Sequence, residues 1–307
     1  MAIVAALSTL CSCIYEYPDE NTGVVANCSL RVNYDWSEAP EANAEGMASL
    51  FFPQTHGTPW RFDLPTNGGW VRMPQDSYDI ITYNHDTHNI LTLNGDDYDE
   101  LFFCTRPTEL TEGVGTLYLG PQPPRSRDEE QPVLAQPNKM WVSALPSQFI
   151  TPQTAEMVFK PRAVTAKFTI IVEDITNLGG AYQMSMALSG LASGFVPSTM
   201  LPREEPVVMP GSLGRSGATS VSGQLLCWGD CAATASNTAY IYFWLSDGKK
   251  LSYEFDVSEQ VESAPDPMNV TIRLGPIELP ENTGGSSSGG LDVGVDSWNV
   301  IDIELST

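Results

Sequence analysis

The sequence of 307 residues is poor in basic side chains and contains three histidines. Lys and Arg together number 15 against 38 Asp and Glu, which gives a formal net charge of −23. A surface of this charge repels the phosphates of nucleic acids and anionic lipid headgroups, so we expect no nucleic-acid partner. The sequence also lacks an H-E-x-x-H pattern, typical of zinc proteases, and a glycine-rich phosphate loop, typical of nucleotide-binding proteins.

Two strings resemble catalytic or metal-binding motifs without their structural context. Gly285-Ser-Ser-Ser-Gly289 matches the G-x-S-x-G nucleophile elbow, but no strand pattern precedes it and no helix pattern follows. His85 and His88 are three residues apart, yet no helix pattern would aim both rings at one ion. The acidic run that follows lacks calcium-loop spacing (Asp96, Asp97 and Asp99). We therefore predict a protein that is not an enzyme, with no catalytic residue, no metal and no cofactor.

Long apolar runs are absent as well, since none reaches the roughly 20 residues that span a bilayer. The first apolar run, residues 2–10, leads into Leu10-Cys11-Ser12-Cys13, a pattern typical of bacterial lipoprotein signals. The small Ser12 precedes Cys13, whereas the bulky Leu10 precedes Cys11. We predict a signal peptide over residues 1–12 and a lipid anchor on Cys13. No basic residue begins this signal, and the alternative is a buried N-terminal strand with ordinary cysteines.

Four further cysteines remain after the signal. Cys227 and Cys231 enclose Trp-Gly-Asp, a turn sequence, and disulfides persist in exported proteins, so we predict a disulfide between them. Cys28 and Cys104 lie in separate strand-like segments, and the sequence leaves them either paired or as buried thiols. A zinc site would need a second close pair or neighbouring histidines, and neither is present.

Apolar and polar residues alternate with a period of two through most of the chain, which predicts half-buried strands with one solvated face. These strands cover residues 28–34, 251–257, 270–274 and 301–305, and more apolar, central strands cover 167–172 and 240–245. Shorter candidates are 78–83, 90–93, 101–103, 115–119 and 140–143. No helix of more than two turns is expected, although residues 36–46 would allow a short one. The pattern predicts an all-β, antiparallel β-sandwich fold.

The length is sufficient for two domains, and a new series of strands begins after Pro161. We predict a tether over residues 13–27, an N-terminal β-sandwich over 28–160 and a C-terminal β-sandwich over 161–307. The Pro-rich loop 122–132 is assigned to the first domain. The Gly/Ser segment 284–290 is a flexible tether to a last strand.

The last strand is amphipathic. It begins near Trp298 and places Ile301, Ile303 and Leu305 on one face. Such a strand either completes its own sheet or adds to the open edge of a neighbouring molecule.

Trp60 and Trp70 flank a Gly/Pro-rich region. They either close the end of a sandwich core or form exposed platforms for sugar stacking. The second interpretation gives an alternative function, a glycan-binding surface lipoprotein in which loop acids complete the site.

Several local segments, in this order, resemble an uncharacterised lipoprotein family of Bacteroides-type bacteria related to the fimbrillins and fimbrial anchor proteins. They are residues 13–18, 32–36, 47–53, 61–65, 68–69, 78–84, 86–87 and 161–168. The resemblance implies two tandem transthyretin-like, Greek-key β-sandwiches. It also implies an outer-membrane lipoprotein that acts as a fimbrial subunit, anchor or accessory protein in adhesion, with other fimbrial subunits as partners.

The resemblance also assigns roles to individual residues. Fimbrillins of this kind are trimmed after an arginine, and the end strand of a neighbouring subunit fills the groove that is freed. Arg31, in the first strand-like segment, is the nearest match to such a processing site. The acidic residues after Cys13 resemble signals that place such lipoproteins on the cell surface (Glu16, Asp19 and Glu20).

Overall fold

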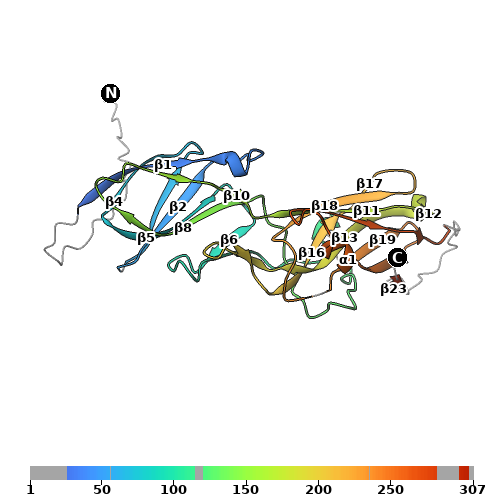
Figure 1. Cartoon of the computed structure of the whole chain (residues 1–307). Coiled ribbons are helices and arrows are strands. Elements are labelled where there is room, and N and C mark those ends of the chain that lie inside the picture. Colours follow the sequence, from blue (N-terminus) through green and yellow to red (C-terminus); the bar gives the residue numbers. More distant parts are fainter. Residues whose placement is uncertain (1–25, 56, 115–119, 235, 282–296, 304–307) are drawn as a thin grey trace, which may run out of the picture.

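The computed structural model describes residues 26–55, 57–114, 120–234, 236–281 and 297–303. These residues form β-strands in several sheets, with a single short α-helix, α1 (Ser258–Glu262), among them. The predicted all-β sandwich class is confirmed. The described chain is elongated, with one group of sheets toward each end (Figure 1). No helix among the described residues has the length and apolar character needed to cross a membrane.

The first sandwich is formed by strands between residues 27 and 163. Its smaller sheet has the order β4 (Gly69–Pro74), β1 (Asn27–Tyr34) and β9 (Glu156–Phe159). Its larger sheet has the order β10 (Arg162–Ala163), β8 (Trp141–Ile150), β5 (Asp76–Asn84), β2 (Met47–Pro53) and β3 (Trp60–Leu64). Leu30, Phe51 and Ile80 are fully buried between the sheets. Alternation along β1 thus produces the buried face that the sequence predicts.

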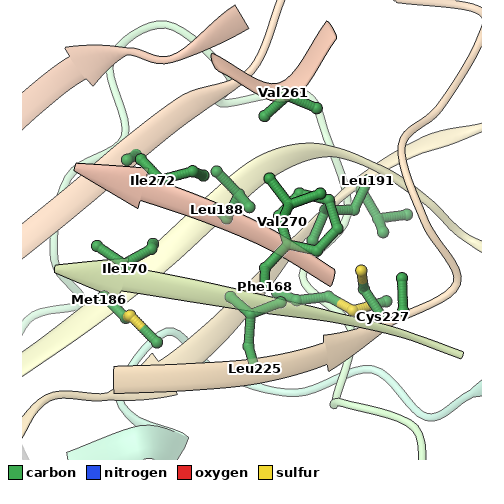
Figure 2. Close-up of a cluster of buried hydrophobic side chains, with 14 of the residues drawn as sticks. Phe168, Ile170, Met186, Leu188, Leu191, Leu225, Cys227, Val261, Val270 and Ile272 are labelled. Carbon is green, nitrogen blue, oxygen red and sulfur yellow. The ribbon is translucent and has the colours of Figure 1, made fainter. Parts of the chain in front are cut away.

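The second sandwich contains the largest core. One sheet has the order β17 (Gly214–Arg215), β18 (Val221–Cys227), β11 (Ala166–Val172) and β21 (Asn269–Leu274). The other has the order β16 (Pro206–Ser212), β13 (Ala181–Ala192), β19 (Thr238–Leu245), β20 (Lys250–Asp256) and β23 (Trp298–Ile303). Figure 2 shows Phe168 and Ile170 of β11 beside Leu188 of β13 in this core. The short strands β12 (Ile175–Thr176) and β22 (Ile277–Glu278) pair beside it.

A further sheet joins residues from both halves of the chain. Its order is β15 (Leu201–Pro202), β14 (Gly194–Val196), β7 (Phe102–Thr105) and β6 (Ile90–Leu93). Phe103 of β7 pairs with Phe195 of β14, and both side chains belong to the large core cluster. Strand pairing therefore crosses the predicted boundary at residue 160.

The Pro-rich loop, which the sequence analysis assigns to the first domain, contacts the second sandwich. Residues 120–134, which we call the strap, cross the outer face of the sheet that contains β16, β19 and β20. Leu134 donates its backbone N–H to Val208 of β16 at 3.0 Å. The Tyr242 hydroxyl donates to the Pro124 carbonyl at 3.0 Å. The strap covers a sheet face that would otherwise meet solvent.

The strap also covers the polar face of residues 251–257, which the sequence analysis expects to be exposed to solvent. Ser252 and Glu254 alternate with apolar residues, yet both are buried, with exposed fractions of 0% and 1%. The Glu254 carboxylate accepts hydrogen bonds from the Ser126 backbone N–H at 3.1 Å and from the Ser126 hydroxyl at 2.6 Å. A second buried carboxylate, Asp128 of the strap, accepts the Tyr240 hydroxyl at 2.7 Å. These polar contacts compensate for burial of the two acids.

We expect Ser126→Ala to lower the free energy of unfolding by about 1–3 kcal/mol, because it leaves a buried carboxylate without one of its two donors. Urea unfolding of both proteins, followed by tryptophan fluorescence, measures the difference. Ser216→Ala is the matched control, since Ser216 bonds another serine in an exposed loop. Equal midpoints for the wild type and Ser126→Ala would show that the strap contact contributes nothing to stability.

Most predicted strands are present. Residues 28–34, 167–172, 240–245, 251–257 and 270–274 correspond to β1, β11, β19, β20 and β21, and four of the shorter candidates overlap β5, β6, β7 and β8. The candidate 115–119 lies outside the described residues. The short helix allowed over 36–46 is a single 3-10 turn, Trp36–Glu38. Helix α1 was not predicted.

Candidate assembly edge and the predicted site residues

The described C-terminal strand, β23, lies at the edge of the five-stranded sheet (Figure 1). It runs parallel to β20, with Trp298 opposite Lys250 and Ile303 opposite Phe255. Leu305, predicted to share its apolar face, lies outside the described residues, as does the tether 284–290. The position at the edge means that β23 pairs with one neighbour and leaves its other backbone side unpaired within the described sheet.

The side chains of β23 are buried to a small extent. Val300 is 46% exposed and Ile301 is 37% exposed, while Ile303 packs against the large core. The predicted row of Ile301 and Ile303 is therefore buried at one end only. Burial of apolar surface stabilises a strand by roughly 25 cal/mol per Å². Because β23 buries little apolar surface, this contribution to its stability is small.

Trp298 is the main apolar anchor of β23. Its ring meets Trp244 edge to face at a centroid distance of 5.0 Å and Tyr242 at 5.6 Å. Its indole N–H donates to the Pro121 carbonyl of the strap at 3.2 Å. Asp302 forms an ion pair with Arg127, also in the strap. The strap and the last strand thus close one small core together, in which Tyr240, Tyr242 and Trp244 are buried.

Burial raises the pKa of the Tyr242 hydroxyl well above its usual value, so this group remains protonated and donates to the strap. If β23 leaves the sheet, the ring of Tyr242, the ring of Trp244 and the backbone edge of β20 lose their cover. A sheet edge of this kind accepts an added strand, with backbone hydrogen bonds for affinity and alternate side-chain pockets for specificity. The geometry is suited to strand exchange.

Arg31, the predicted processing site, lies in the middle of β1. It pairs with Trp70 of β4 on one side and with Glu156 of β9 on the other. Its backbone N–H donates to the Ala155 carbonyl at 2.9 Å. A protease that needs an extended, unpaired substrate would reach this bond only after β1 leaves its sheet.

Trp60 and Trp70, the two tryptophans of the alternative sugar site, lie in different sheets. Trp60 lies on β3 and is partly buried against the first core. Trp70 lies on β4, in the opposite sheet, and is 63% exposed. A single sugar site lined by both rings is therefore not formed.

No group of three or more metal-ligating side chains gathers in the part of the chain that the structure describes. His85 lies at the end of β5, close to Gly46, and His88 follows in the next loop. The Gly285–Gly289 string lies outside the described residues, and so do Cys13, Glu16, Asp19 and Glu20.

The four described cysteines are free thiols. Cys28 bonds within the first sandwich, to the Ile150 carbonyl, whereas Cys104 lies on β7 in the sheet that joins both halves. Cys227 and Cys231 are both buried, and burial raises the pKa of the Cys227 thiol to about 12. A thiol that stays protonated reacts slowly, since the thiolate is the nucleophile.

A disulfide between Cys227 and Cys231 is a proposal for the exported protein. We expect a mass 2 units lower for the bridged peptide than for the reduced one, because a bridge removes two hydrogens. Digestion without reduction, followed by mass spectrometry, measures this. The stabilisation should lie at the low end of about 2–4 kcal/mol, because the loop is short. Alkylation of both thiols in native protein isolated from the periplasm or cell surface would refute the bridge.

Sequence reasoning missed the buried acids Glu254 and Asp128. Glu254 occupies a polar position in an alternating strand, which predicts solvent exposure. No residue pattern near Glu254 indicates that the strap covers it. Asp128 lies within a charged, Pro-rich loop of the kind that usually remains on the surface.

Comparison with known proteins gives a family and a fold. The family described as Domain of unknown function (DUF5119) matches residues 14–210. No curated protein matches the sequence.

Among solved structures, a “putative adhesin” from Bacteroides ovatus aligns with a TM-score of 0.64 at 16% identity, covering 83% of this chain and 93% of that one. A second protein of the same description and organism aligns with a TM-score of 0.53 at 10% identity, covering 85% and 90%. The fimbrial anchor protein Mfa2 from Porphyromonas gingivalis aligns with a TM-score of 0.50 at 9% identity, covering 81% and 90%. At these identities the likeness shows a shared fold, as the resemblance in sequence predicted.

Proposed function

The chain belongs to the DUF5119 family, and from this premise we propose that it is a surface adhesion protein of the fimbrial type, not an enzyme. The observation that carries the proposal is β23, a weakly buried strand at a sheet edge beyond a Gly/Ser-rich segment. The shared fold with proteins named as adhesins and as a fimbrial anchor supports the same role.

In this proposal, Cys13 carries the lipid that holds the protein on the outer membrane, with the two sandwiches outside the cell. Other fimbrial subunits are the partners, and contact is made by strand exchange at a sheet edge. A net charge of −23 keeps the surface soluble and disfavours non-specific contact with anionic membranes.

Processing after Arg31 would make the first sandwich an acceptor. Loss of residues 27–31 would remove the part of β1 that pairs with β4, together with the fully buried side chain of Leu30, and would open a groove in the first sandwich. An anchor that keeps its lipid on Cys13 would keep β1 whole. Subunit and anchor roles are therefore distinguished by the N-terminus of the mature protein.

The test is expression of the full chain in a Bacteroides-type host, with isolation of surface filaments and of outer membranes. We expect the protein in the outer-membrane or filament fraction, accessible to protease added to intact cells. Recovery as a free periplasmic monomer that neither labels with fatty acid nor associates with filaments would refute the proposal. The N-terminal residue of the recovered protein then distinguishes the two roles: Cys13 indicates an anchor, and the residue after Arg31 indicates a processed subunit.

A further inference from the structure

The outer face of the small sheet β4-β1-β9 has no cover among the described residues and carries a distinctive set of side chains. Leu30 and Val32 of β1 point into the core, so Ser29, Arg31 and Asn33 point outward. On β4, Val71 and Met73 are buried, while Trp70 and Arg72 are exposed. On β9 the outward residues are Glu156 and Val158. Figure 1 shows β1 and β4 side by side in the half of the molecule remote from β23.

Trp70 is the centre of this face. Trp70 is 63% exposed, because its position on β4 alternates with that of the buried Val71 and therefore points outward. Arg31 is directly opposite Trp70 in the antiparallel pair, and its guanidinium carbon lies 6.0 Å from the centre of the indole ring. Arg72 lies two residues along β4 and therefore on the same face as Trp70.

Hydrogen bonds hold the polar side chains in place. The Arg31 Nε donates to the Asn33 side-chain oxygen at 3.1 Å. The Asn33 amide in turn donates to the Glu156 carboxylate. Glu156 is opposite Arg31 on the β9 side, remote from β4, and its carboxylate accepts from Asn33, so the charged groups next to Trp70 on this face are those of Arg31 and Arg72. This is a local exception in a chain of net charge −23.

We propose that the outer face of β4 and β1 binds a carboxylated pyranose, a uronic-acid residue within a polysaccharide. The apolar C–H face of the sugar ring would pack on the exposed Trp70 indole, while Arg31 and Arg72 bind the carboxylate. Charge complementarity selects the acid: two guanidinium groups flank the ring, and the nearest described carboxylate on this face is turned toward Asn33. The proposal applies to the form that keeps β1 whole, because processing after Arg31 would remove that residue from the face. It deepens the adhesive role and rests on it for the exposure of this face to extracellular polymers.

A uronate polymer fits this surface better than a nucleic acid does. It carries far fewer charges along its length than duplex nucleic acid, which has one charge per about 1.7 Å, so it is repelled less by the acidic remainder of the protein.

The test is isothermal titration of the full chain, purified in detergent, with hyaluronan and polygalacturonate oligosaccharides at low salt. Carboxyl-reduced hyaluronan is the matched ligand, because it keeps the backbone and lacks the charge. We expect weak binding of at least one acidic oligosaccharide and at least tenfold weaker binding of the reduced form. Trp70→Ala and Arg72→Gln should each weaken binding at least tenfold, and Trp70→Phe should lose less.

Tyr182→Ala is the control variant, since Tyr182 is an exposed aromatic residue of β13, 66% exposed, in the other sandwich. Unchanged circular dichroism and filament association in the Trp70 and Arg72 variants would show that folding and the proposed assembly role are intact. Equal binding of acidic and reduced oligosaccharides, binding that survives Trp70→Ala, or no binding of either acidic probe would each overturn the proposal.

Discussion

Removal of residues 297–307 should abolish assembly into filaments while leaving the two sandwiches folded. The reason is that β23 buries little: Val300 and Ile301 are 46% and 37% exposed, and the strand has β20 as its one neighbour in the described sheet. An internal strand of the same length would remove a packed row of the core and would unfold its domain. We expect the melting temperature to fall by a few degrees, from loss of the Trp298 contacts with Trp244 and Tyr242.

Thermal unfolding by circular dichroism and the recovery of the protein in isolated filaments measure the two effects separately. Trp298→Ala is the partial variant, because it removes the aromatic anchor and keeps the strand. It should lower the melting temperature less than the truncation does, because the Asp302–Arg127 ion pair and the pairing with β20 remain, and it should retain assembly. If the truncated protein is unfolded, β23 is an ordinary last strand of its sheet. If the truncated protein is folded and still assembles, β23 has no role in assembly.

Replacement of Cys13 by alanine should eliminate fatty-acid incorporation completely. The thiol of Cys13 is the acceptor that the Leu10-Cys11-Ser12-Cys13 pattern predicts, because the small Ser12 precedes it. The anchoring energy is large, because each buried methylene contributes about 0.8 kcal/mol and several acyl chains add together. The variant should therefore move from the membrane fraction to the soluble fraction.

Growth with labelled palmitate, followed by gel fluorography and membrane fractionation, measures both outcomes. Cys11→Ala is the matched control, since it lies two residues away and should label normally. If Cys13→Ala still labels and Cys11→Ala does not, then the acceptor is Cys11. If both single variants label, the double variant Cys11→Ala, Cys13→Ala decides: labelling of the double variant places the lipid elsewhere and overturns the anchor proposal.

Local strand structure was largely predictable, because alternation of apolar and polar residues is a property of consecutive positions. The segment 270–274 reads as a half-buried strand, and β21 alternates between exposed and buried residues throughout. The longest described strand, β13, was not predicted because it does not alternate: its residues from Ser185 to Ala192 are buried on both faces. A strand enclosed between two layers loses the period of two on which the prediction depends.

The candidate sites were predictable to a smaller extent. Trp60 and Trp70 look equivalent in the sequence, but β3 and β4 belong to opposite sheets, so one ring faces the core and the other faces solvent. Whether a given aromatic residue points inward depends on the register of its strand and on the sheet that the strand joins. Neither is encoded within a few residues of the tryptophan itself.

The sequence alone determined the all-β class, most strand positions and the acidic surface, because each follows from local alternation, turn residues or a simple count. The tertiary structure decided what covers each face. The strap crosses from the first half of the chain to bury Glu254 and Tyr240. Strand β7 pairs with β14 across 90 residues or more, as in Phe103 with Phe195 and Cys104 with Gly194. These contacts join residues that are far apart in the chain, and their stability comes from packing and from mutual satisfaction of buried polar groups. Contacts between residues so far apart in the chain cannot be predicted from a local sequence pattern.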